Sequence, residues 1–249
     1  MKNRSLCVLP CLIASILSTF IQISAQTPAA SSMYSSGPVT DYQKALPDSS
    51  DVLRFRRGER YNSPDAVTPE IGEDSQSTSI GVRLGDSGGD PAPFGTSDTV
   101  VVGSVDSGQA FLSNDKQVIY SEFVVSIQEV IKAPHTPYIA PGQKIDVERK
   151  GGVIRLPSGK LVTRGSAEQS MPTVGRRYLL FLKYSADTND YLITTGYELF
   201  QGHAYSLDGL DQSERSWTPV RRPLHQKSDD EAKFLEGMRA KSSEKGGAQ

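Results

Sequence analysis

The chain has 249 residues, of which 22% are charged and 37% hydrophobic, and its formal net charge at pH 7 is −2. A chain this close to neutrality is not typical of nucleic-acid-binding proteins, so no nucleic-acid partner is expected. Only two cysteines are present, Cys7 and Cys11. The chain beyond them therefore has no disulfide and no thiol nucleophile, and a hydrophobic core alone must hold its fold.

Residues 1–25 have the layout of a cleavable secretory signal peptide. Lys2 and Arg4 form a short basic start, residues 6–23 carry no charge, and Ala25 supplies the small residue that signal peptidase requires. We expect cleavage after Ala25, export to the periplasm or the extracellular space, a mature net charge of −4 and no membrane span in the mature chain. An uncleaved membrane anchor is the alternative, although Pro10 interrupts the apolar run.

Residues 26–95 are rich in Ser, Pro, Gly, Asp and Thr, and their apolar residues follow neither a helical nor a strand period. Such a segment cannot bury enough apolar surface to offset its chain entropy, which predicts a largely disordered linker. Residues 51–61 (DVLRFRRGERY) stand out because they contain four arginines. They fit a short helix, a docking peptide or a solvated basic run within the linker, and the last interpretation is favoured.

Residues 96–210 show the patterns of a β domain. The β-branched run over residues 99–105 is typical of a strand buried on both faces. Residues 119–131 alternate, with Phe123 on one face and Glu122 on the other. Further short apolar segments follow, separated by Gly, Pro, Asn and Asp. The fold class predicted is mostly β, a small OB-like barrel or sandwich with a disordered N-terminal segment.

Residues 211–249 form a polar tail that contains one predicted helix. Ser228 and Glu231 have the spacing of a capping box, and Phe234, Leu235 and Met238 follow at helical spacing. We expect one short C-terminal helix over about residues 229–241. It is too short to be stable alone in water, so it either docks on the barrel or frays.

Three segments of the β domain carry a resemblance to known proteins: residues 98–105 (DTVVVGSV), 130–132 (VIK) and 175–181 (GRRYLLF). They resemble a group of uncharacterised bacterial exported proteins. The order of the elements is also similar to that of netrin-like modules, which have an OB-type β-barrel and include the tissue inhibitors of metalloproteinases. The resemblance implies the fold. It does not carry over inhibition, because those inhibitors use an N-terminal cysteine and none follows Cys11 here.

Motifs for catalysis or metal binding are missing from the sequence. The histidines, His135, His203 and His225, lack the spacing of metal ligands. Ser113 and Lys116 match the S-x-x-K pattern of serine acyl enzymes, but the accompanying S-D-N and K-T-G elements are missing, and Asn-Asp between them favours a turn. We therefore assign no catalytic residue, no metal and no cofactor.

Basic residues are concentrated between Lys144 and Lys183, where nine of them face three acidic residues. Arginine and lysine groups on one face of a barrel would suit carboxylates, phosphates or sulfates. The alternative is that these charges only keep edge strands soluble. The candidate ligand-binding residues are Arg149, Lys150, Arg155, Lys160 and Arg164.

Two functions remain open from the sequence. The favoured one is an exported, non-catalytic binding or interaction module whose partner is an anionic glycan or a protein of the envelope or the extracellular space. The alternative is an extracytoplasmic hydrolase with an unrecognised active site. The missing motifs favour the binding module.

Overall fold

The structure is a computed structural model that describes residues 37–64, 68–76, 78–80, 92–133, 137–166, 169–208 and 230–246. The predicted signal peptide, His135 and His225 lie outside these residues. No helix in the part of the chain that is described is both long enough and apolar enough to cross a membrane.

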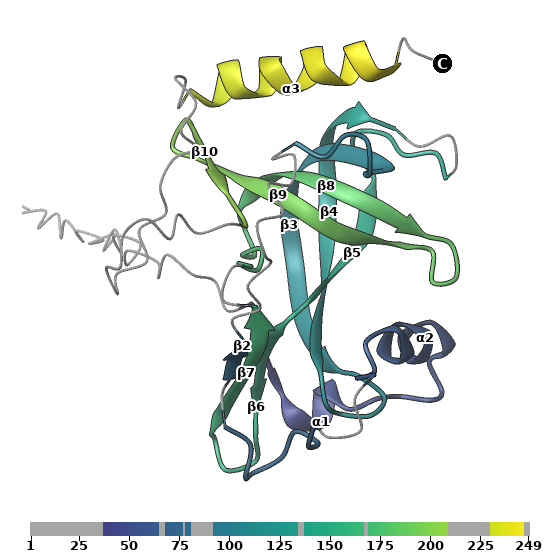
Figure 1. The fold of residues 1–249 in the computed structure, drawn as a ribbon, viewed down its shortest axis with the longest axis vertical. Helices are drawn as coiled ribbons and strands as arrows, with labels where there is room; N and C mark the ends of the chain where they lie inside the picture. Colours follow the sequence, from purple (N-terminus) through teal and green to yellow (C-terminus); the bar gives the residue numbers. More distant parts are fainter. Residues whose placement is uncertain are drawn as a thin grey trace, which may run out of the picture. The chain divides into compact units, whose positions relative to one another are not determined.

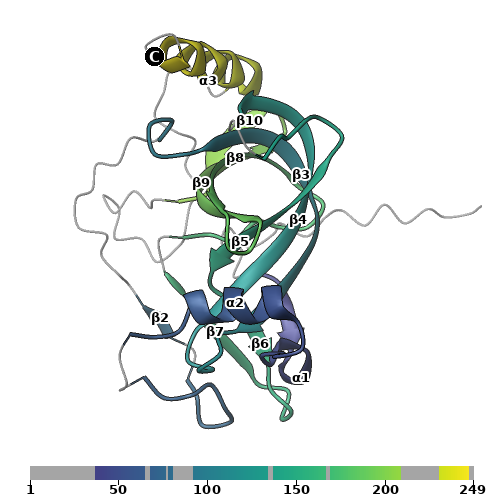
Figure 2. The ribbon, with the colours of Figure 1, turned by 90° about the vertical axis from the view of Figure 1, so that its right-hand side faces the viewer.

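The centre of the molecule is a closed β-barrel of five strands. They pair in the order β9–β5–β4–β3–β8, and pairing of β8 with β9 closes the ring. Figure 2 shows this ring of strands. The short β10 extends β9 as an antiparallel hairpin. The predicted mostly-β fold and small barrel are confirmed. The bounds are β3 (Thr99–Leu112), β4 (Ile119–Lys132), β5 (Lys144–Lys150), β8 (Arg177–Ser185), β9 (Asp190–Phe200) and β10 (His203–Ser206).

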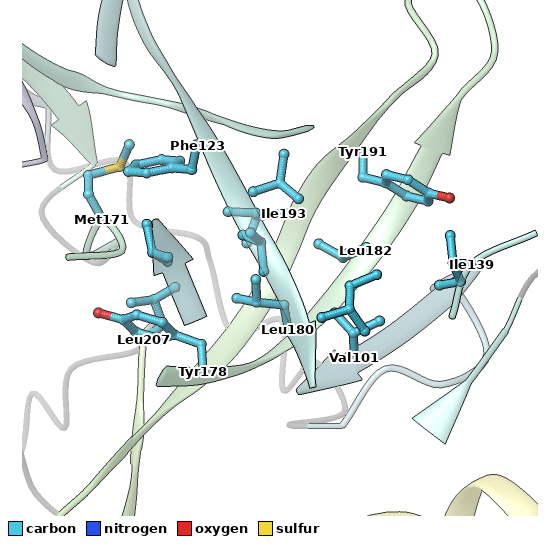
Figure 3. Close-up of a cluster of buried hydrophobic side chains, with 14 residues drawn as sticks. Val101, Phe123, Ile139, Met171, Tyr178, Leu180, Leu182, Tyr191, Ile193 and Leu207 are labelled. Atoms are coloured by element: carbon cyan, nitrogen blue, oxygen red, sulfur yellow. The ribbon is translucent and has the colours of Figure 1, made fainter. Parts of the chain in front are cut away.

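The barrel strands bury apolar side chains on alternate positions, as their sequence pattern predicts. Phe123, Leu180 and Tyr191 lie in the interior cluster, part of which Figure 3 shows. Val102 and Phe181 belong to a second cluster. Strands β3 and β8 are thus buried on both faces, which explains the uninterrupted β-branched run in β3.

A second, smaller sheet is built on the hairpin of β6 (Gly152–Arg155) and β7 (Leu161–Ser166). Strand β1 (Val39–Asp41) pairs with β6 in parallel, and β2 (Thr78–Ile80) pairs with β7 in parallel. Gly152 connects this sheet to β5 with a φ of 148°, and a Cβ there would lie 2.6 Å from Ser121 Oγ. The sharp passage between the two sheets therefore requires glycine.

Helix α3 (Glu231–Gly246) confirms the predicted C-terminal helix, with a start two residues later and an end five residues later than expected. Phe234, Leu235 and Met238 are buried in the second cluster, where the Phe234 ring packs against Tyr197 of β9. The Arg239 guanidinium donates to both carboxylate oxygens of Glu129 on β4, at 2.6 and 2.7 Å. The helix therefore docks on the barrel.

The prediction of disorder is wrong for residues 37–64, which contain β1, α1 (Tyr42–Ala45) and α2 (Val52–Arg60). The segment is ordered by its contacts with the rest of the fold, since it has little apolar periodicity of its own. Ala45 is buried in a third cluster with Leu112 and Ile154. Helix α2 is held mainly by charged contacts to the barrel, described below. Figures 1 and 2 show α2 beside one end of the barrel.

Candidate functional site

Helix α2 begins at a regular N-cap and contacts the barrel through its inward face. The Asp51 carboxylate accepts a hydrogen bond from the Arg54 amide at 3.0 Å. Gly58 faces the β3–β4 turn, where the Asn114 amide donates to the Gly58 carbonyl at 3.3 Å. The Asn114 side chain donates to the Phe55 carbonyl at 2.9 Å. A Cβ at Gly58 would meet Asn114 Oδ1 at 2.3 Å, so the close approach depends on this glycine.

Three acidic side chains lie beneath α2 on adjacent strands, and we call them the carboxylate cluster: Glu122 of β4, Glu148 of β5 and Asp190 of β9. Glu122 and Glu148 are directly opposite each other in the β4–β5 ladder. Glu148 is 1% exposed and Asp190 is 0% exposed. Like charges opposite each other destabilise a sheet, and buried ones do so strongly, so this arrangement needs cations.

Two arginines of α2 supply those cations. Arg57 Nε lies 2.6 Å from Asp190 Oδ2, and its Nη1 lies 2.8 Å from Glu122 Oε2. Arg60 Nη1 lies 2.8 Å from Glu148 Oε1 and 3.6 Å from Asp190 Oδ1. The two arginines are three positions apart, which places both on the same face of the helix. They thus connect α2 to three barrel strands at once.

Polar and aromatic side chains complete the surroundings of the cluster. Thr188 Oγ1 donates to Asp190 Oδ1 at 2.7 Å, and Arg60 Nη2 donates to Ser185 Oγ at 2.6 Å. Tyr61, at the end of α2, stacks on Tyr120 of β4 with ring centroids 4.7 Å apart. The rings add apolar cover, which keeps the local dielectric low and strengthens the ion pairs.

The two most buried carboxyl groups have pKa values shifted in opposite directions. Burial raises the pKa of Glu148, and its hydrogen bond with Asp190 raises it further. Burial also opposes ionisation of Asp190, but hydrogen bonds from Glu148 and Thr188 and the charges of Arg57 and Arg60 outweigh it, so the pKa of Asp190 is lowered. The two shifts therefore favour a proton on Glu148 over one on Asp190.

An acid and a carboxylate side by side could serve general acid–base chemistry if a substrate reached them. Here Arg57 and Arg60 pair with Glu148 Oε1 and with both oxygens of Asp190, and α2 covers the two side chains. No set of His, Cys, Asp and Glu side chains among the described residues is arranged to hold a metal ion. The arrangement is a buried ionic anchor for α2.

The S-x-x-K segment is a turn. Ser113 Oγ donates to Asp115 Oδ1 at 2.5 Å and accepts a hydrogen bond from the Val118 amide at 2.9 Å. Its oxygen is thus used within the β3–β4 connection, as the turn interpretation predicts.

The five predicted basic residues do not share one surface. Arg149 is buried in β5 and forms an ion pair with Asp208. Lys150 is exposed at the end of β5. Arg155 is exposed at the end of β6, with Nη1 3.0 Å from Asp41 Oδ1. Lys160 Nζ donates to the Glu73 carbonyl at 3.0 Å, and Arg164 Nη1 donates to the Gln76 carbonyl.

The register of the β6–β7 hairpin separates these charges further. Arg155 is opposite Leu161, whereas Arg164 is opposite Gly152. Residues 152 and 155 are an odd number of positions apart, so Arg155 and Arg164 point to opposite faces of the hairpin. Arg149 also does not contribute to an exposed basic face, because its side chain is buried and its guanidinium pairs with Asp208.

Sequence reasoning missed the α2 arginines and their carboxylate partners. Two signals pointed toward them: four arginines within eleven residues, and acidic residues on the outward face of strands that are otherwise apolar. Neither signal says which charge meets which, because that depends on the β4–β5–β9 register. The chain matches no protein-family model, and no curated protein is significantly similar to it.

Proposed function

We propose that the chain is an exported, non-catalytic interaction module that binds a protein partner through the outward face of α2. The observation that carries this proposal is the exposure of two large apolar side chains on the face of this nine-residue helix that is turned away from Arg57 and Arg60. Val52 is 60% exposed and Phe55 is 39% exposed, and the two are three positions apart. Exposed apolar side chains that lie next to each other are a mark of protein-binding surfaces.

The anchoring of α2 supports the same proposal. The buried arginines fix the helix, so its outward side chains are presented without further ordering, which lowers the entropic cost of binding. Arg56 and Glu59 are exposed beside the apolar residues, in the manner of a polar rim. Arg56 Nη1 donates to the Asp187 carbonyl at 3.2 Å, which orients the guanidinium. The partner that fits is a protein with an apolar groove and a carboxylate placed to meet Arg56.

An anionic glycan is the weaker candidate. It would need the basic residues of the β5–β7 region to act together, and Arg155 and Arg164 lie on opposite faces of their hairpin. Arg149 is already committed to Asp208. A hydrolase is not favoured either, because the acid–base pair of Glu148 and Asp190 is covered by α2.

The test is a double substitution, V52S with F55S, set against L161S with V174S, which removes two apolar side chains of similar exposure from elsewhere. Both double variants should keep the stability of the parent within about 1 kcal/mol, since isolated surface changes cost little. The partner is captured by cross-linking in an extract of the producing cells and is then purified. Its Kd is measured for the parent and for the two double variants.

We expect the α2 variant to bind at least about tenfold more weakly, which corresponds to about 1.4 kcal/mol. The L161S and V174S variant should bind as the parent does. Equal affinity of the parent and the α2 variant would place the interaction surface elsewhere.

A further inference from the structure

The charges buried beneath α2 do not balance when every group is ionised. Glu122, Glu148 and Asp190 would carry three negative charges, against the two positive charges of Arg57 and Arg60. An uncompensated buried charge is strongly unfavourable, whereas a protonated carboxyl group is tolerated. The closed arrangement therefore retains one proton that the same side chains, exposed to water at neutral pH, would release.

Geometry places that proton on Glu148. Its Oε1 faces Arg60 at 2.8 Å, while its buried Oε2 makes no ion pair with the described cations, and the Tyr61 hydroxyl is the neutral neighbour of this carboxyl group. The hydroxyl group of a protonated Glu148 can donate a hydrogen bond to Asp190. Asp190 then stays ionised and pairs with Arg57. The raised pKa of Glu148 and the lowered pKa of Asp190 agree with this assignment.

Ten charged or titratable side chains, counting Glu148 itself, lie at or around the Glu148 carboxyl group, contributed by every element packed there. Arginines stay charged throughout the usable pH range. Burial raises the pKa of both Tyr61 and Tyr120, so they stay neutral. Burial also raises the pKa of Glu122, whose charge is offset by Arg57. The full set is Arg54, Arg57, Arg60, Tyr61, Tyr120, Glu122, Asp146, Glu148, Asp187 and Asp190.

We propose that α2 is a proton-held latch: it is closed on the barrel while Glu148 is protonated, and it is released locally when that proton is lost. The sign follows from linkage. The closed state binds a proton that the open state does not, so the stability of the closed state is fully present below the ordinary pKa range of glutamate and falls as pH rises. This goes beyond the proposed function, because it concerns whether the α2 surface is held in place and does not depend on a partner.

The test is amide hydrogen exchange of the intact protein, followed by mass spectrometry from pH 5 to pH 9. Rates for peptides covering residues 52–60 are expressed as protection factors, which removes the intrinsic pH dependence of exchange. We expect protection to fall about tenfold per pH unit over at least two units, as one released proton requires. Peptides from β4 should keep their protection, which distinguishes release of α2 from unfolding of the barrel.

The variant E148Q replaces the protonated carboxyl group with a neutral amide and should remove the pH dependence of α2 protection. The matched control is E129Q, which makes the same change on β4, where Glu129 pairs with Arg239 and not with α2, and it should retain the parent's slope. A parent protection factor that is flat from pH 5 to pH 9, or an E148Q slope equal to the parent's, would overturn the latch. If E148Q does not fold, the pH dependence of the parent's α2 protection factors alone decides whether the latch exists. Exchange involves no partner, so failure of the latch and failure of the α2 surface are separate results.

Discussion

At the scale of single residues, two neighbouring arginines of α2 have opposite roles. Arg57 is buried and lies within 3 Å of both Asp190 and Glu122. Arg56 is exposed and donates to the Asp187 carbonyl. The residue type is the same, and only the helical phase decides which guanidinium becomes structural. Counting arginines in the sequence therefore overestimates the charge available to a ligand.

Substituting these two arginines separately should give very different stabilities. R57A leaves the carboxylate cluster without its main cation and should lower the free energy of unfolding at pH 7 by about 3–5 kcal/mol. R56A should change it by no more than about 0.5 kcal/mol. Urea denaturation of both variants measures the difference. The loss in R57A should shrink toward acidic pH, where the carboxyl groups are neutralised by protons, and equal effects of the two substitutions would mean that Arg57 is not buried as described.

At the scale of elements, the barrel strands were predictable and α2 was not. Strand β4 shows its alternation in the sequence, and β3 and β8 show continuous apolar runs, because each strand is stabilised by its own buried face. Helix α3 was predictable for the same reason. Helix α2 has few inward apolar residues. Its main partners lie on β4, β5 and β9, 65 to 133 positions away in the sequence, and no local pattern encodes such pairs.

The barrel strands should depend on their interior side chains far more than the second sheet depends on its exposed ones. L180A empties a fully buried position of β8 and should cost about 2–5 kcal/mol of unfolding free energy through the cavity it leaves. L161A, in the exposed part of β7, should cost less than about 1 kcal/mol. Calorimetric melting of the two variants compares them, and a small loss in L180A would contradict the interior packing in Figure 3.

At the scale of the whole molecule, the folded unit includes residues that the sequence assigns to a linker. Strand β1 completes one edge of the second sheet, α1 packs in the third cluster, and α2 covers the carboxylate cluster. These contacts connect residues 39–60 to strands that follow much later in the chain. A barrel beginning near residue 96 would lack its ionic anchor and leave the carboxyl groups of Glu122, Glu148 and Asp190 without their guanidinium partners.

The most direct test of this account is limited proteolysis at pH 6, where α2 is expected to be closed, with the resistant species weighed by native mass spectrometry. Native conditions keep a nicked but bound segment with the barrel, so the mass reports what remains folded together. The account predicts that the smallest resistant species contains residues 39–60 along with the barrel strands. A resistant species that begins near residue 95, with residues 39–60 digested, would contradict it.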